Sequence, residues 1–281
     1  VTYPEAVAVQ VEQSDDPEGT LKDLMTDHIR GVAAHFAGRV GVWDVVNEHL
    51  TSRIDDNIFY ATLGDDYVRF AFETASSSLP DGSRLVWNEA LANFSLEDPA
   101  IKWWLDTLRT YREESVPIDG VGIQGHNINR KHNIADLSLF LKNVVDMGYD
   151  VELTEFDAPI KLFSDEDDPF EAQGDFFRDY ANAFLGTGGC KGLTFWGLDD
   201  NHTWYDAFFA ETRPNLPLLI DEMGYVKPAW LGVRDALEAS AIPRTSGQPS
   251  SLPSSPPIQP SRQPSLQSPS QPSFQHPSLQ P

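Results

Sequence analysis

Apolar and polar positions along residues 1–242 recur with two periods, one typical of strands and the other of helices. Short β-branched runs predict buried strands at residues 40–47, 84–88, 120–126, 150–155 and 191–198. Longer amphipathic stretches predict helices near residues 66–78, 98–114, 134–147, 169–185 and 228–239. Because helical segments separate the five strands, we expect parallel pairing in an α/β domain.

An earlier helix is expected after the sequence DDPEG. Thr20 and Asp23 have the spacing of a capping box, which predicts that this helix begins at Thr20. Apolar residues then keep helical spacing as far as Gly38, where we expect the helix to end; they are Leu21, Leu24, Met25, Ile29, Val32 and Phe36.

The pattern stops near Pro243. Residues 243–281 consist mostly of Pro, Ser and Gln, and the tetrapeptides PSLQ, PSFQ and PSLQ begin at positions 264, 272 and 277. Such a segment cannot bury enough apolar surface to offset its ordering entropy. We therefore expect a folded domain at 1–242 and a disordered linker or tail at 243–281.

Charge limits the classes of partner. The formal net charge is −23, and all 43 acidic residues lie in the first 242 positions. Nucleic acids and anionic membrane surfaces carry the same sign, so neither is expected as a partner, whereas a neutral carbohydrate escapes this repulsion. Cys190 is the only cysteine and the histidines are scattered, so neither a disulfide within the chain nor a metal site is expected.

Polar residues that could take part in chemistry close each expected strand. They are Asn47-Glu48, Asn88-Glu89, Gln124 and His126, Glu155 and Asp157, and Asp199-Asp200. In parallel α/β folds the ligand lies at the carboxyl ends of the strands. One such pair would only mark a turn, but five indicate a shared site.

Five motifs resemble glycoside hydrolase family 10 in content and in order. They are WDVVNE at 43–48, GIQGH at 122–126, LTEFD at 153–157, LTFWGLDD at 193–200 and KPAW at 227–230. The resemblance covers roughly residues 20–240 and implies a TIM (β/α)8 barrel with endo-β-1,4-xylanase activity, retention of configuration and no cofactor. The strands here match the fourth to the eighth of that barrel. The first three, with further sugar-binding residues, would precede Val1, so we expect the chain to be inactive alone.

The same resemblance implies two catalytic carboxyl groups. Retaining hydrolysis uses one carboxylic acid to protonate the leaving oxygen and one carboxylate to attack the anomeric carbon. By resemblance, Glu48 is the acid/base and Glu155 is the nucleophile. From the residues alone, Glu89 stays open as a rival because it also ends a strand.

The resemblance also implies supporting roles around Glu155. His126 would donate a hydrogen bond to Glu155, and Asp157 would orient His126. Asn47 would bind the 2-hydroxyl of the cleaved sugar, and Gln124 would line the same pocket. On its own, His126 could equally be a structural histidine at a strand end.

Tryptophans supply the expected apolar platforms. Trp196 and Trp204 match family positions that contact the sugar faces, although a tryptophan near a strand is more often part of the core. Trp87, Trp103 and Trp104 are interpreted as core packing. Two departures from the family affect specificity: Asn-Glu-Ala-Leu at 88–91 replaces the usual Asn-Asp-Tyr-Asn, and no basic residue directly follows Trp204.

Xylan is the expected substrate, cleaved inside the chain with retention. The alternatives are a related activity on β-1,4-glucan or aryl glycosides, a non-catalytic carbohydrate-binding relic, and a purely structural acidic domain. The resemblance further implies an extracellular protein whose Pro/Ser linker leads to a carbohydrate-binding module.

Overall fold

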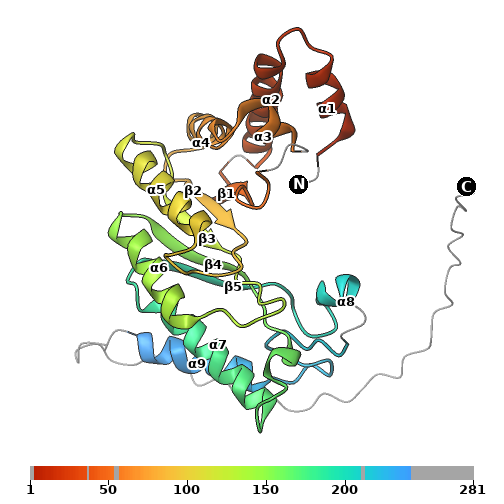
Figure 1. Cartoon of the computed structure of the whole chain (residues 1–281), viewed down its shortest axis with the longest axis vertical. Helices are drawn as coiled ribbons and strands as arrows, with labels where there is room; N and C mark the ends of the chain where they lie inside the picture. Colours follow the sequence, from red (N-terminus) through yellow and green to blue (C-terminus); the bar gives the residue numbers. More distant parts are fainter. Residues whose placement is uncertain (1–2, 37, 54–56, 210–212, 242–281) are drawn as a thin grey trace, which may run out of the picture. The chain divides into compact units, whose positions relative to one another are not determined.

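The structure is a computed structural model that describes residues 3–36, 38–53, 57–209 and 213–241. Its centre is a sheet of five parallel strands in chain order (Figure 1). The strands are β1 (Val42–Asn47), β2 (Arg84–Glu89), β3 (Gly120–Ile123), β4 (Asp150–Phe156) and β5 (Cys190–Phe195). The predicted α/β class and parallel pairing are confirmed. The expected tail at 243–281 lies outside the described residues.

Helices connect the strands, and α4 to α7 lie along one side of the sheet in Figure 1. The longer helices are α1 (Glu5–Glu12), α2 (Pro17–Phe36), α4 (Asp66–Ser78), α5 (Pro99–Glu113), α6 (Ile134–Asp146), α7 (Pro169–Leu185) and α9 (Pro228–Ser240). Short turns of helix are α3 (Ile58–Leu63), η1 (Ile160–Phe163) and α8 (Tyr205–Phe208). The helices predicted from residue 66 onward are confirmed to within a residue or two, whereas α1 and the short turns were not predicted.

The start of α2 was predicted wrongly. The helix begins at Pro17, and the side chain of Asp16 accepts a hydrogen bond from the Gly19 N–H at 3.0 Å. Thr20 therefore lies inside the first turn, where its hydroxyl pairs with that of Ser14 at 2.7 Å. An acidic N-cap followed by proline at the first helical position satisfies the free N–H groups earlier than the expected capping box would.

Two strands are shorter than predicted. β3 ends at Ile123 rather than at residue 126, and β5 ends at Phe195 rather than at residue 198. A glycine with positive φ follows each of them, Gly125 at 82° and Gly197 at 153°. Such backbone angles are incompatible with a regular strand and turn the chain away from the sheet.

Aromatic side chains form the core between the sheet and its helices. Trp87 of β2 and Trp104 of α5 are fully buried, with ring centroids 5.7 Å apart, which confirms their predicted role in packing. Trp104 stacks on Phe140 of α6. Further along the sheet, Phe156 of β4 stacks on Tyr180 of α7 at 4.3 Å. Parallel strands covered by helices in this way position their carboxyl ends rigidly.

The sheet has two unpaired edges in the described part of the chain. In the described part of the chain, β1 pairs only with β2 and β5 pairs only with β4, so each outer strand has one unpaired edge. Val42 of β1 is 41% exposed as a result. This arrangement agrees with the expectation of about five of the eight strands of a TIM barrel.

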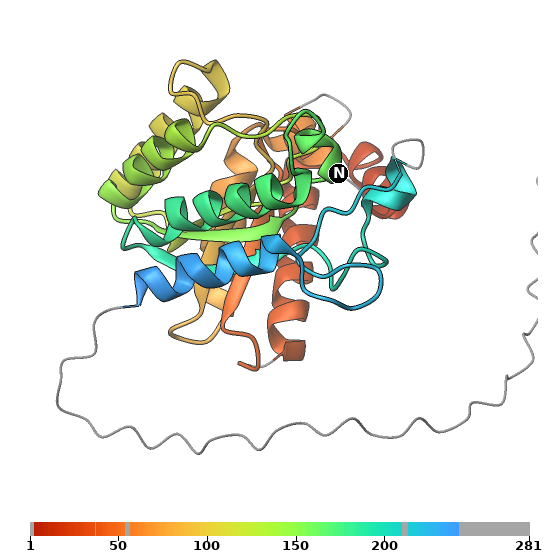
Figure 2. The same cartoon turned by 90° about the horizontal axis from the view of Figure 1, so that it is seen from below.

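Helices α7 and α9 pack very closely (Figure 2). A Cβ atom added at Gly232 of α9 would lie 2.2 Å from the carbonyl oxygen of Gly174 in α7. The segment before α9 is fixed by a buried ion pair, in which Lys227 Nζ donates to Asp200 Oδ2 at 2.9 Å. Lys227 also donates to the carbonyl of Leu216 at 2.8 Å. These contacts tie the loop after β5 to the last helix.

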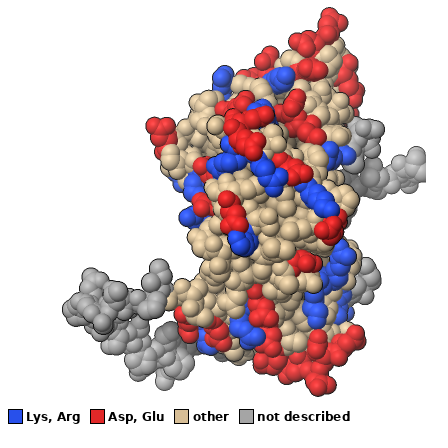
Figure 3. Space-filling view, turned by 60° about the vertical axis from the view of Figure 1, so that its left-hand side comes forward, with Lys and Arg blue, Asp and Glu red and all other residues tan. Residues whose placement is uncertain are grey.

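The surface is acidic. Figure 3 shows carboxylates gathered at the upper and lower ends of the view, with Lys and Arg interspersed between them. None of the described helices has both the length and the apolar character needed to cross a membrane.

Candidate active site

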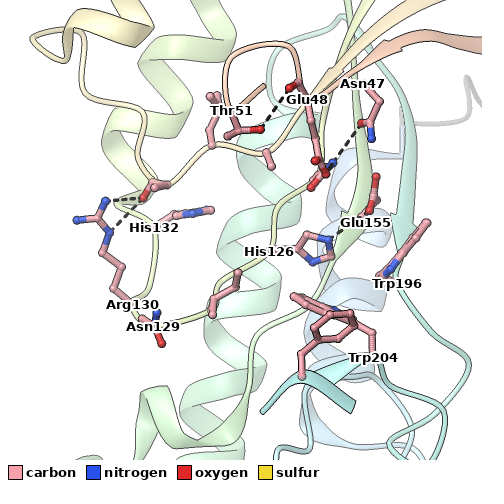
Figure 4. A pocket seen from close by; sticks show the side chains of 16 residues that line it. Asn47, Glu48, Thr51, His126, Asn129, Arg130, His132, Glu155, Trp196 and Trp204 are labelled. Carbon is pink, nitrogen blue, oxygen red and sulfur yellow. Dashed lines mark hydrogen bonds and ion pairs between the residues drawn. The ribbon is translucent and has the colours of Figure 1, made fainter. Parts of the chain in front are cut away.

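A pocket of about 960 Å³ lies at the carboxyl ends of the five strands (Figure 4). Seven of the predicted site residues line it: Asn47, Glu48, Gln124, His126, Glu155, Trp196 and Trp204. The other lining residues are Thr51, Ala90, Leu91, Ala92, Ile128, Asn129, Arg130, His132 and Phe208. The described residues contain no group of three or more His, Cys, Asp or Glu placed to hold a metal ion.

Glu155 accepts hydrogen bonds from two side chains. Asn88 Nδ2 donates to its Oε1 at 3.0 Å, and His126 Nε2 lies 3.2 Å from its Oε2. Asn88 is itself oriented by the hydroxyl of Thr154, which donates to its Oδ1 at 2.7 Å. Gly122 makes room for this amide, because a Cβ there would lie 2.5 Å from Asn88 Oδ1. The sequence marked Asn88 as a strand end but assigned it no role in the site.

His126 lies between two carboxylates. Its Nδ1 is 2.9 Å from Asp157 Oδ1 and its Nε2 faces Glu155. Burial alone would lower the pKa of His126, but the hydrogen bonds and negative charges of Asp157 and Glu155 outweigh burial and raise the pKa to about 9. The ring is therefore protonated at neutral pH and donates from both nitrogens.

Asp157 is fully buried behind His126. Its carboxylate also accepts hydrogen bonds from Trp204 Nε1 at 2.8 Å and from the Tyr205 hydroxyl at 3.2 Å. Burial raises the pKa of Asp157, and the hydrogen bonds from these three partners oppose that rise. Asp157 thus fixes both the imidazole and the indole that face the pocket.

Glu48 follows β1 directly and has a φ of 59°, an uncommon backbone angle for a residue other than glycine. Gln124 Nε2 donates to Glu48 Oε1 at 2.9 Å and to Asn47 Oδ1 at 3.2 Å. Asn88 Nδ2 donates to the same Asn47 oxygen at 2.9 Å. Three amides therefore connect Glu48 with Glu155, and no described residue accepts a hydrogen bond from Nδ2 of Asn47, which can donate to a ligand.

Glu89 does not line the pocket. Its carboxyl group is fully buried and accepts hydrogen bonds from Trp87 Nε1 at 2.7 Å and from the Leu50 N–H at 3.1 Å. Burial raises the pKa of Glu89 to about 8, although these hydrogen bonds act in the opposite direction. The structure therefore places Glu89 outside the pocket, which does not support the rival assignment of Glu89 as a catalytic carboxylate.

Aromatic side chains line one side of the pocket. Trp196 is 46% exposed, and Trp204 packs against His126 with ring centroids 5.0 Å apart. Phe208 contacts Trp204 at 5.4 Å and is 71% exposed, yet it was not predicted as a site residue. The aromatic run at 204–209 was the signal that could have identified it.

Two curated relatives illustrate the sequence similarity. The chain is 31% identical over 236 residues to endo-1,4-beta-xylanase A of Humicola insolens, covering 82% of this chain and 61% of the relative. It is 32% identical over 230 residues to endo-1,4-beta-xylanase 5 of Pyricularia oryzae, covering 79% and 54%. The chain thus spans somewhat more than half the length of these relatives.

Solved structures share the fold. Native xylanase 10B from Thermotoga maritima superposes with a TM-score of 0.68 and 27% identity, covering 79% of this chain and 68% of that one. A thermostable xylanase mutant from Cellvibrio japonicus gives a TM-score of 0.69 at 26% identity, covering 84% and 74%. The sequence model of glycosyl hydrolase family 10 matches residues 3–236. The chain therefore belongs to glycosyl hydrolase family 10.

Proposed function

We propose that this chain provides the two catalytic carboxylates of a retaining endo-β-1,4-xylanase. The observation that carries the proposal is that Glu48 and Glu155 line the same pocket, at the ends of β1 and β4, with different partners. Glu155 lies beside the protonated ring of His126, which offers a charged hydrogen bond to a carboxylate. Glu48 accepts a hydrogen bond from the neutral amide of Gln124.

The different surroundings of the two carboxyl groups suit two different catalytic roles, acid/base for Glu48 and nucleophile for Glu155. Glu48 donates a proton to the glycosidic oxygen while Glu155 attacks the anomeric carbon and forms a covalent glycosyl–enzyme. Glu48 then removes a proton from water, which releases the sugar with its configuration retained. Asn47 Nδ2 donates to the 2-hydroxyl of the reacting sugar, an interaction that strengthens in the transition state.

The names of the similar proteins support xylan as the substrate. Both relatives described above are named endo-1,4-beta-xylanases. A further structural neighbour, with a TM-score of 0.68 and 27% identity, is a mutant in complex with xylotriose. The exposed face of Trp196 offers an apolar surface to a sugar ring at the same pocket.

Azide rescue tests the two roles in the enzyme that contains this chain. In Glu155→Ala the nucleophile is absent, so azide restores turnover of an aryl xylobioside and yields the α-azide. In Glu48→Ala the covalent intermediate still forms from a good leaving group, and azide traps it as the β-azide. Glu166→Ala, which removes an exposed carboxylate paired with Lys131, serves as a control and keeps full activity.

The products decide the assignment. The opposite pattern of azides would exchange the two roles. Rescue of neither variant, or full activity in either one without azide, would remove the assignment altogether.

A further inference from the structure

The turn after β1 carries Glu48 in a conformation that needs support. Glu48 has positive φ, and the following residues turn back at once, with the Ser52 N–H donating to the Glu48 carbonyl at 3.1 Å. A residue with a side chain at such an angle is held there by its surroundings rather than by its own preference. The direction of the Glu48 side chain therefore depends on what fixes residues 49–52.

The carboxyl group of Glu89, at the end of β2, forms hydrogen bonds with the backbone of this turn. Both of its carboxyl oxygens lie near the Leu50 N–H, at 3.1 and 3.2 Å. The carboxyl group is held in place from the other side by Trp87 Nε1 at 2.7 Å.

The His49 side chain anchors the turn at a second point. It is fully buried, with Nδ1 at 2.9 Å from the Tyr67 hydroxyl and Nε2 at 2.9 Å from Asp65. Its ring also packs against Trp87 and Trp103, with centroid distances of 5.7 and 5.6 Å. The backbone after Glu48 is thus fixed by His49 in the helix layer and by Glu89 in the sheet.

We propose that Glu89 is a positioning residue that holds the turn after β1 and thereby directs the Glu48 carboxyl group toward the glycosidic oxygen. The proposal rests on the function proposed above for Glu48. Glu89 does not line the pocket, so its effect passes through the backbone N–H of Leu50. Loss of its acceptors therefore impairs proton donation to the leaving group more than attack by Glu155, which lies on β4.

Dependence on the leaving group tests this in the enzyme that contains the chain. Glu89→Leu removes both acceptors, whereas Glu89→Gln keeps one oxygen and rescues part of the loss. We expect Glu89→Leu to lower kcat on xylo-oligosaccharides by about tenfold or more, since these need a proton on the leaving oxygen. The formation of the glycosyl–enzyme from a dinitrophenyl xylobioside, which needs no such proton, should change by less than about threefold.

Asp119→Ala is the matched control. The exposed Asp119 carboxylate accepts the Leu85 N–H at 2.8 Å, so this variant removes a carboxylate that accepts a backbone N–H at the opposite end of β2. Asp119→Ala should change kcat on xylo-oligosaccharides and the rate of glycosyl–enzyme formation from the dinitrophenyl xylobioside by the same factor. An equal loss on both substrates in Glu89→Leu, or no loss on either, would overturn the proposal.

Amide exchange provides a second measurement that does not depend on activity. In the chain itself, the Leu50 amide should exchange at least about tenfold faster in Glu89→Leu than in the native protein, and at the native rate in Asp119→Ala. An unchanged Leu50 amide would also overturn the proposal. A native enzyme inactive on both xylosides would refute the proposed function, while Leu50 exchange would still decide whether Glu89 holds the turn.

Discussion

Replacing His126 with Gln should remove a pH-dependent part of the folding stability. The pKa of His126 is about 9 in the folded chain and about 6.5 in a model peptide, because Asp157 and Glu155 stabilise its protonated form. The native state therefore binds this proton more tightly than the unfolded state does. One pKa unit corresponds to 1.36 kcal/mol, so the protonated ring contributes about 3 kcal/mol.

The direction of the effect follows from the raised pKa. This stabilisation is fully present below a pH of about 6.5 and is lost as the pH rises through about 9. Urea unfolding of the native chain and of His126→Gln at several pH values measures it directly. The difference between their free energies of unfolding should fall by about 3 kcal/mol between pH values of about 6 and 10, with about 2 kcal/mol of that fall above about pH 7.5.

His132→Gln is the matched control. His132 is also buried, but burial lowers its pKa to about 4, so it is uncharged in both states above about pH 7.5. Its substitution should change stability by an amount independent of pH in that range. If the curves for His126→Gln and the native chain run parallel from about pH 7.5 upward, the charged pair of hydrogen bonds described for His126 is wrong.

Two further predictions concern the packing of the last helix. Lys227→Met should destabilise the chain by about 3–5 kcal/mol in urea unfolding, since it leaves the buried Asp200 carboxylate unpaired, and a second change, Asp200→Leu, should recover part of the loss. Gly232→Ala should lower stability by about 1–3 kcal/mol because its Cβ would overlap the Gly174 carbonyl, whereas Gly31→Ala, with open space around it, should be neutral or slightly stabilising. Thermal unfolding followed by circular dichroism measures the glycine pair, and equal shifts of the midpoint would contradict the close packing.

The order and type of the main elements followed from the sequence because the buried strands and amphipathic helices are strongly patterned. Helix α1 did not, because Val7, Val9 and Val11 recur at every second position, as in a strand, and of the α1 residues only Val11 is buried. The start of α2 was missed because Asp16 and Thr20 are both good N-caps and only the backbone decides between them.

Asn88 and Glu89 show where reasoning about the site from sequence stops. Successive residues of a strand point to opposite faces, so only one of these two could face the pocket. β2 is buried on both faces, so its sequence lacks the alternation of apolar and polar residues that would show which of the two side chains faces the pocket. The structure turns Asn88 toward Glu155 and Glu89 toward Trp87, on the side of the sheet covered by helices.

The amides between the two carboxylates have a fixed polarity. Gln124 and Asn88 turn their nitrogens toward Glu48 and Glu155, and the Asn88 oxygen accepts from the Thr154 hydroxyl. The second N–H of each amide donates to Asn47 Oδ1. Because its oxygen already accepts two hydrogen bonds, Asn47 presents its Nδ2 to the pocket as a donor. We therefore expect the ligand group that meets Asn47 to be a hydrogen-bond acceptor, such as a hydroxyl, and a substituent without an acceptor at that point to bind more weakly.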